Sequence, residues 1–278
     1  MNNKKIILQK QSTISTIVLI IFVLIALFPI GLVLLNSMKS SFEILNNPVS
    51  LPSAFSFANY ISAWRAADLA RGFFNSIRLT GGTILIVVIT STLAGYALAQ
   101  NSGKAMGAVK LYFMLAMTVP MQLFLFPLYY ILAKCNLISN FIAISFVLAA
   151  VNLPLSVFLM RTFFLNVPSS LEEAARMDGA GTFQVLTKIM VPMVYPGMIT
   201  VATIVGLYTW NEFLLTSTFM QGEENFTATL SYRALNSTAP DYGQLMAGAV
   251  IMILPIIIFF LLVQKYFIEG LTNGAVKG

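Results

Sequence analysis

Six long stretches without a charged residue divide this chain and constrain its fold more than any other feature. They lie between Lys10 and Lys39, Arg78 and Lys104, Lys110 and Lys134, Lys134 and Arg161, Lys188 and Glu212, and Asp241 and Lys265, and they hold 28, 25, 23, 26, 23 and 23 residues. A helix needs about 20 apolar residues to cross the hydrocarbon core of a membrane, so each stretch is long enough. A seventh interval, between Glu43 and Arg65, contains Pro48 and Pro52 and is excluded. The pattern predicts an all-α polytopic membrane protein with six transmembrane helices.

We expect one transmembrane domain over residues 1–278, with spans at about 14–36, 77–100, 111–133, 138–160, 194–216 and 244–266. Only 9% of the residues are charged, against about 25% in ordinary soluble domains. An even number of spans places both termini on one side, and cytoplasmic loops carry an excess of Lys and Arg. With the termini inside, ten basic residues lie in the cytoplasm and six outside. We therefore predict cytoplasmic termini and a cytoplasmic loop at 166–192.

Several kinds of chemistry are excluded by residues that the chain lacks. It has no histidine, which excludes His-based acid–base catalysis and His metal ligation. It has no Gly-x-x-x-x-Gly-Lys-Ser/Thr phosphate-binding loop and no carboxylate cluster for a divalent cation. The net charge of +6 includes no basic cluster with interleaved aromatic residues, so no nucleic-acid partner is expected. We predict no catalytic residue, no metal site and no cofactor in this chain, and a membrane enzyme is disfavoured.

The loop at 166–192 has the pattern of two short helices joined by a tight turn. Ser169 followed by Glu172 fits a capping box at the start of the first helix, and Gly179 permits a sharp stop. A second helix is expected from Thr182, as its cap, to Pro192, as its end, with three apolar residues on one face: Phe183, Leu186 and Met190. Helices of about ten residues are marginal alone in water, so the pair is expected to pack on a protein surface.

The spacing of residues in this loop is similar to the EAA loop of ATP-binding-cassette (ABC) importer permeases. Glu173-Ala174-Ala175 is followed after three residues by Gly179, and after nine more by Ile189-x-Val191-Pro192, with valine where the family usually has leucine. In that family the loop forms a coupling helix that docks into a groove of a cytoplasmic ATPase. The resemblance implies a set of ATPase-coupling residues: Glu172, Glu173, Ala174, Ala175, Asp178 and Gly179. An ordinary helical loop and a DNA-reading helix-turn-helix are the alternatives, and two carboxylates beside a membrane span argue against the second.

Further segments resemble the smaller, six-span permease of carbohydrate importers of the maltose and multiple-sugar type. They are Arg161-Thr162-Phe163-Phe164, Trp210-Asn211-Glu212-Phe213, Gln264-Lys265-Tyr266-Phe267, Gly270-Leu271-Thr272 and Gly274-Ala275-Val276-Lys277-Gly278. The resemblance implies the MetI-like permease fold and a location in the bacterial cytoplasmic membrane, in contact with lipid. It also implies a second permease subunit, an ABC ATPase dimer that binds ATP and Mg²⁺, and an extracytoplasmic sugar-binding protein. The C-terminal tail either touches the ATPase or is disordered.

Polar residues inside the predicted spans are candidates for a substrate pathway. The fifth span is the least apolar, because its eight Ile, Leu, Val or Phe residues between 199 and 215 supply only roughly 2–5 kcal/mol of insertion free energy. An acidic residue at mid-membrane costs about 3 kcal/mol, so this span needs protein or water contacts. The candidates are Gln122, Asn152, Thr209, Asn211 and Glu212. On a helical wheel Thr209 and Glu212 share one stripe and Asn211 lies nearly opposite, and either stripe can line the pathway.

Two other kinds of transporter remain as alternatives. A proton-coupled secondary transporter would use Glu212 as its proton carrier and would need no ATPase. An ABC importer of peptides or amino acids would carry a related loop. Hydroxyls, amides and aromatic rings with little charge agree with a neutral sugar better than with an ion or a phosphate.

Overall fold

A computed structural model describes the backbone of residues 2–101, 103–236 and 241–275, and the side chains of residues 15–101, 103–236 and 241–265. Every secondary-structure element in these ranges is a helix, which confirms the all-α prediction. The elements are α1 (Asn2–Asn36), α2 (Ser41–Asn46), α3 (Ala58–Ala66), α4 (Leu69–Gln100), α5 (Lys104–Ala116), η1 (Met121–Phe124), α6 (Leu125–Lys134), α7 (Phe141–Leu165), α8 (Ser169–Met177), α9 (Thr182–Val185), η2 (Leu186–Met190), α10 (Val191–Met193), α11 (Tyr195–Asn211), α12 (Leu214–Phe219), η3 (Glu223–Asn225), α13 (Ala228–Ala234) and α14 (Tyr242–Ala275). The last three residues of the predicted C-terminal tail lie outside the described residues.

Four of these helices contain a segment long and apolar enough to cross a membrane alone: Ser15–Asn36, Leu69–Gln100, Phe141–Leu165 and Tyr242–Lys265. Two pairs of helices pass the same test together but are bent at a short break. Lys104–Ala116 and Met121–Lys134 meet at 90°, and Thr182–Met193 and Tyr195–Asn211 meet at 73°. Counting each bent pair as one span gives up to six spans in the described part of the chain, in agreement with the number of uncharged stretches.

The third predicted span contains a sharp break. α5 ends at Ala116, and Pro120 enters η1 with an extended backbone (ψ 123°). Proline disfavours the helical conformation for the residue before it, here Val119, so the helix cannot continue smoothly through this point. The structure thus has two helical arms at 90° to each other where we expected one span at about 111–133. A count of apolar residues does not register such a break, because both arms are apolar.

The chain divides into two compact units, of which the first comprises Met1–Leu69 and Tyr232–Leu254. In this unit Lys39 is only 1% exposed, and its Nζ donates to the carbonyl oxygens of Asn47 and Pro48 at 3.2 Å each. Asn59 Nδ2 donates to the carbonyl oxygens of Ser37 and Lys39 at 2.9 and 2.8 Å. These side-chain bonds to backbone carbonyls hold α2 and α3 against the end of α1, since each buried carbonyl needs a donor.

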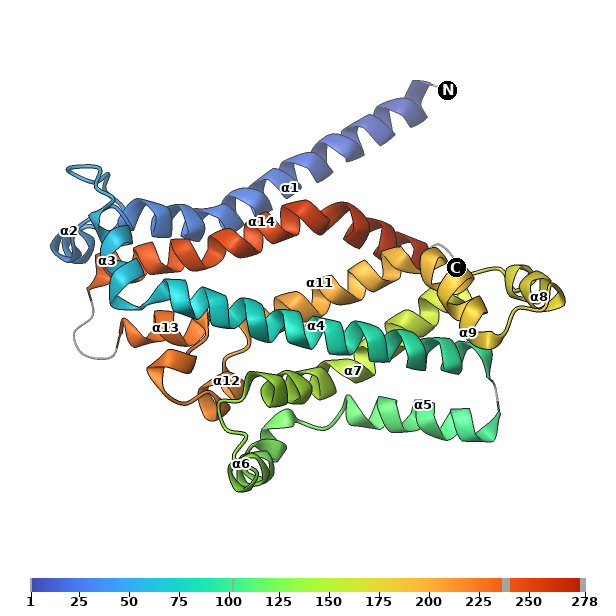
Figure 1. Cartoon of the computed structure of the whole chain (residues 1–278). Helices are drawn as coiled ribbons and strands as arrows, with labels where there is room; N and C mark the ends of the chain where they lie inside the picture. The colour runs from blue at the N-terminus through green and yellow to red at the C-terminus, as the bar shows by residue number, and fades with distance from the viewer. Residues whose placement is uncertain (1, 102, 237–240, 276–278) are drawn as a thin grey trace. The chain divides into compact units, whose positions relative to one another are not determined.

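The second unit comprises Ala70–Ser231 and Pro255–Gly278. Within it α4, α7 and α11 run side by side (Figure 1), and glycines allow their close approach. A Cβ atom at Gly95 of α4 would lie 2.8 Å from Cβ of Met160 and 2.9 Å from the backbone nitrogen of Arg161, both on α7. A Cβ atom at Gly197 of α11 would overlap the ring of Phe163 on α7. Small residues at helix contacts are typical of membrane proteins, where packing rather than water exclusion holds helices together.

Candidate functional site

The predicted loop folds into two helices at one end of the second unit, beside the Gln100 end of α4 (Figure 1). α8 is the first helix, and the second runs through α9, η2 and α10 from Thr182 to Met193, one residue beyond the expected end. Between them Gly179 has a φ of +83°, a left-handed conformation that glycine adopts without steric cost. The prediction of two helices joined by a turn at Gly179 is therefore confirmed.

The predicted caps of the two helices were wrong. Pro168 is the N-cap residue of α8, and no side chain makes a capping hydrogen bond there. α9 begins after Gly181, whose N–H donates to Gln184 Oε1 at 3.2 Å, so Thr182 is the first helical residue and not the cap. Glu172 does not form the expected capping box with Ser169, because its carboxylate is bonded to other donors.

One face of the loop, here called the inner face, packs on the ends of the helices of the second unit. Its buried residues belong to one apolar cluster with Met160 and Phe164 of α7: Ala175, Val185, Leu186 and Met190. This contact supplies the protein surface that such short helices need. Phe183 was expected on the same face, but it lies in the first turn of α9 and is 74% exposed.

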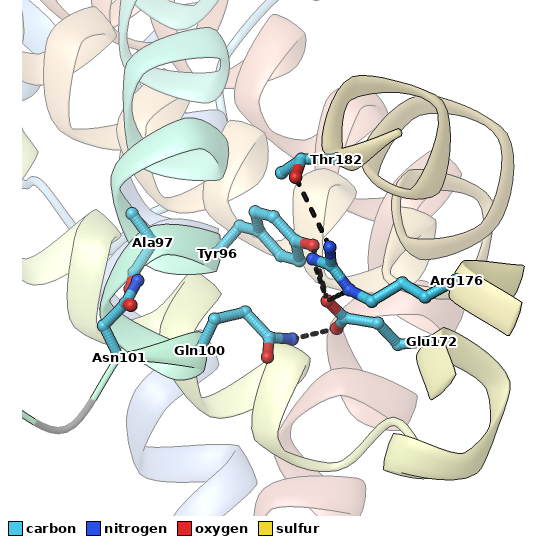
Figure 2. A network of polar contacts seen from close by, with 7 residues as sticks. All are labelled: Tyr96, Ala97, Gln100, Asn101, Glu172, Arg176 and Thr182. Atoms are coloured by element: carbon cyan, nitrogen blue, oxygen red, sulfur yellow. Dashed lines mark hydrogen bonds and ion pairs between the residues drawn. The ribbon is translucent and has the colours of Figure 1, made fainter. Parts of the chain in front are cut away.

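Glu172 lies on the inner face and is only 7% exposed. Figure 2 shows its carboxylate at the centre of a polar network that joins α8 to the end of α4. Tyr96 Oη donates to Oε1 at 3.0 Å, and Gln100 Nε2 donates to Oε2. From α8 itself, Arg176 donates to Oε1 through Nε at 3.1 Å and Nη2 at 2.7 Å. Both oxygens of this buried carboxylate are therefore satisfied, which a buried charge requires.

The hydrogen bond to Glu172 is also the main cause that raises the pKa of the Arg176 guanidinium above its usual value. Arg176 reaches across the turn as well, since its Nη1 lies 3.5 Å from Thr182 Oγ1 at the start of α9. The network therefore links α4, α8 and α9. Sequence reasoning missed Tyr96 and Gln100, which precede Glu172 by 76 and 72 positions, and no local pattern marks them.

Two further side chains hold the same end of α4. Arg161 of α7 donates from Nε to the carbonyl oxygen of Leu98 at 3.2 Å. Asn101 Nδ2 donates to the carbonyl oxygen of Ala97 at 2.9 Å. The last carbonyls of a helix lack partners within the helix, so these donors stabilise its end.

The opposite face of the loop is exposed, and we call it the outer face: Glu173, Ala174, Met177, Asp178, Gly179 and Phe183. Met177 is 88% exposed and Phe183 is 74% exposed. Four of the six predicted ATPase-coupling residues lie on this face, whereas Glu172 and Ala175 contact this chain's own helices. Large exposed apolar side chains next to carboxylates are typical of a surface that another protein covers.

Four of the five predicted pathway residues line one cavity of about 420 Å³ in the second unit. Asn152 comes from α7, and Thr209, Asn211 and Glu212 come from the end of α11 and the residue after it. Gln122 is exposed on η1 and is not among the residues that line the cavity. Thr209 and Glu212 were expected on one stripe of a helix, with Asn211 nearly opposite, but α11 ends at Asn211 and Glu212 is extended (ψ 126°), so the helical wheel does not place Glu212.

Glu212 has a structural role at this break. Its Oε1 and Oε2 accept hydrogen bonds from the backbone N–H groups of Leu215 and Thr216, at 2.8 Å each. The carboxylate thus satisfies donors in the first turn of α12, which have no partner within that helix. A side chain held by two backbone bonds is poorly placed to carry protons along a pathway.

The two asparagines that line the cavity each bond through the amide nitrogen to a carbonyl of their own helix. Asn152 Nδ2 donates to the carbonyl oxygen of Leu148, and Asn211 Nδ2 donates to that of Leu207, at 2.8 Å each. A carbonyl oxygen only accepts, so the amide nitrogen must face it and the amide oxygen is left to other partners. Tyr208, which the sequence reasoning did not select, also lines the cavity and is 66% exposed.

The amino-acid sequence of the chain matches the model of a known protein family. The model of the family described as "Binding-protein-dependent transport system inner membrane component" matches residues 88–273, about two thirds of the chain. The chain belongs to this family. It is accordingly a multi-pass membrane permease component of a transport system and not an enzyme.

Two relatives show how far the similarity extends. The arabinooligosaccharides transport system permease protein AraQ of Bacillus subtilis is 34% identical over 260 residues, which cover 92% of this chain and 92% of that protein. The melibiose/raffinose/stachyose import permease protein MelC of Bacillus subtilis is 31% identical over 271 residues, 97% of this chain and 98% of that protein. The family likeness therefore covers nearly the whole chain.

Solved structures show the same fold. A chain of a bacterial ABC transporter involved in the import of the acidic polysaccharide alginate matches with a TM-score of 0.79 and 24% identity, over 92% of this chain and 96% of that one. A chain of the bacterial alginate ABC transporter in complex with an alginate pentasaccharide-bound periplasmic protein matches with a TM-score of 0.66 and 14% identity, over 92% and 93%. The fold is that of an ABC importer permease.

Proposed function

We propose that this chain is a transmembrane permease subunit of an ATP-driven, binding-protein-dependent carbohydrate importer. The observation that carries the proposal is the loop, whose outer face is exposed and whose inner face is bonded to the ends of the spans. The chain has no phosphate-binding loop, so ATP and Mg²⁺ would be bound by a separate ABC ATPase dimer that docks on the outer face. The loop and both termini would lie in the cytoplasm.

The loop is connected to the membrane helices in a way that suits such a role. At one end the chain passes directly from α7 into α8, with Pro168 as the N-cap residue. At the other end the second loop helix leads into α11 through a 73° bend at Val194, which is only 1% exposed. A buried bend of this kind transmits a rotation of the loop to α11, because well-packed side chains resist being displaced independently.

A carbohydrate is the substrate class that the cavity and the relatives favour. The amide oxygens of Asn152 and Asn211 are acceptors, and a sugar presents many hydroxyl donors to such atoms. The relatives AraQ and MelC are named for arabinooligosaccharide transport and for melibiose, raffinose and stachyose import. A peptide or amino-acid importer remains the second candidate, because its loop would be similar.

Transport would follow from the closing and opening of the ATPase dimer. ATP would close the dimer, the loop would move with it, and the spans would switch from inward-facing to outward-facing. A second permease subunit would form the other wall of the pathway, and an extracytoplasmic sugar-binding protein would deliver the sugar. The alginate transporter in complex with its periplasmic protein supports an arrangement of this kind.

The test is purification of the chain from native membranes, identification of the subunits bound to it, and uptake of neutral oligosaccharides into proteoliposomes. We expect a second permease and an ATPase in the complex, and uptake that requires internal ATP and external binding protein and persists with a protonophore. Uptake that needs no ATP and collapses with a protonophore would instead support a secondary transporter. ATP-driven uptake of peptides but not of sugars would support the second candidate.

A further inference from the structure

Glu172 is buried, so docking of a partner on the outer face does not explain why a carboxylate occupies this position. Its side chain points away from the surface that a partner would cover, and it does not cap α8. It lies at the loop and is not among the residues that line the 420 Å³ cavity, so it is not placed to touch substrate. Taking a carboxylate out of water costs free energy that its hydrogen bonds must offset, so stability alone does not explain a carboxylate at this buried position.

What the carboxylate adds is a directional link to α4. Contacts between apolar side chains, such as those of Ala175 and Leu186, depend little on direction. A hydrogen bond is different, because it is lost when the two atoms separate to about 3.6 Å or the angle becomes poor. The bond from Tyr96 Oη is 3.0 Å long, so it is lost when these two atoms move apart by about 0.6 Å more.

The link reaches a helix to which the loop has no direct covalent connection. Covalent connections join the loop to α7 through Pro168 and to α11 through Val194. The path along the chain from α4 to α8 runs through the whole of α5, η1, α6 and α7. The bonds from Tyr96 and Gln100 to Glu172 therefore connect α4 to the loop across 76 and 72 positions of sequence.

We propose that Glu172, held by Tyr96 and Gln100, is the linkage that makes α4 follow the movement of the coupling loop, and that without it ATP hydrolysis is uncoupled from sugar transport. Tyr96, Gln100 and Glu172 are positioning residues in this scheme. Arg176 keeps the carboxylate aimed toward α4 from within α8. The inference rests on the proposed function as an ATP-driven importer.

The test uses the double variant Tyr96→Phe with Gln100→Leu in the assembled importer. Tyr96→Phe removes only the hydroxyl and keeps the ring in its edge contact with Phe164, whose centroid is 5.4 Å away. Glu172, Arg176 and the outer face are left intact, so the ATPase should still bind. Tyr112→Phe, an exposed position on α5, is the matched control.

Three quantities are measured for each variant: ATPase co-purification, sugar-stimulated ATP hydrolysis, and sugar transported per ATP hydrolysed. We expect the double variant to retain the ATPase and hydrolysis, and to lose at least about fivefold in sugar per ATP, a typical size for the coupling between two sites. The Tyr112→Phe control should match the wild type. An unchanged ratio in the double variant would overturn the linkage, and so would loss of the ATPase, which would assign these residues to folding of the loop.

A distance measurement tests the same idea without relying on transport. Spin labels at the exposed positions Ala97 and Ser170, in a Cys135→Ser background, report the separation of α4 and α8 by pulsed electron paramagnetic resonance. In the complex with otherwise native side chains the distance should be the same with and without ATP, and in the double variant it should change with ATP. A distance that changes equally in both proteins would refute the linkage. Absence of ATP-driven uptake in the wild type would instead refute the proposed function.

Discussion

The contact between α4 and α7 can be tested by adding a single methyl group at Gly95. The Cβ atom of an alanine there would lie 2.8 Å from Met160 Cβ and 2.9 Å from the backbone nitrogen of Arg161, against 3.4–4 Å for an ordinary contact. Neither obstacle is the far end of a flexible side chain, so the two helices must separate by about half an ångström or more. They would do so one turn from the Arg161 Nε bond to Leu98, which is already 3.2 Å long.

The expected cost follows from two opposing effects. Overpacking a well-packed contact costs about 1–3 kcal/mol, and alanine is about 0.5–1 kcal/mol better than glycine in a helix. Gly95→Ala should therefore destabilise the chain by a net amount of about 0.5–2 kcal/mol. The measurement is the free energy of unfolding of the purified chain, by titration with sodium dodecyl sulfate in mixed micelles.

The same helix offers matched controls. Gly81 has no atom within 4 Å of the added Cβ position, so Gly81→Ala should be neutral or stabilising by up to about 1 kcal/mol. At Gly82 the nearest atom is Ser145 Oγ at 2.7 Å, a side-chain hydroxyl that can rotate away, so Gly82→Ala should fall between the two. If Gly95→Ala is no more destabilising than Gly81→Ala, the close packing of α4 on α7 described above is refuted.

Three further predictions concern the loop, the pathway and the first unit. Gly179→Ala places a Cβ atom on a residue with a φ of +83°, which costs about 1–2 kcal/mol. ATPase co-purification and sugar uptake should therefore fall. In the control Gly181→Ala, at a φ of −71°, both should be unchanged. Asn152→Leu and Asn211→Leu each remove an amide that lines the cavity. Each should lower the rate of oligosaccharide uptake by at least about fivefold, which corresponds to the loss of one hydrogen bond of about 1 kcal/mol, without lowering the amount of assembled complex. Normal uptake in both variants would show that these residues do not belong to the pathway. Hydrogen bonds, of which that from the Ser53 side chain has the largest effect, lower the pKa of Glu43 from 4.5 to about 2. The stabilising contribution of the Glu43 carboxylate is therefore complete above pH 4.5 and is lost as the pH falls toward 2, so the difference in thermal midpoint between wild type and Glu43→Gln should shrink over that range. A difference that stays constant with pH would contradict the assignment.

The break in the third span shows which features of the fold follow from composition and which depend on tertiary structure. The uncharged stretch between Lys110 and Lys134 holds 23 residues, and its length predicted a span. The 90° bend within it depends on how the two arms pack, because a proline near the centre of an apolar stretch is compatible with a kinked helix as well as with a full break. The same holds at Glu212, where the carboxylate bonds to the next helix and α11 ends.

The loop shows a similar division. The local pattern, with Gly179 at the turn, was sufficient to predict two helices joined by a turn, because helix stops and turn glycines act over a few neighbouring residues. The choice of face was not predictable in the same way. Glu172 and Glu173 are adjacent carboxylates in the sequence, yet one is buried against α4 and the other is exposed.

The sequence by itself determined the all-helical class, the number of apolar stretches and the two-helix loop, because each depends on residues close together in the chain. Only the tertiary structure decided that Tyr96 and Gln100 meet Glu172, and that Asn152 shares a cavity with Asn211. These contacts join residues separated by more than fifty positions, and their formation depends on how the helices cross and where they bend. Hydropathy and the spacing of charged residues do not fix how helices cross or how far they bend, since both depend on the shapes of side chains on different helices.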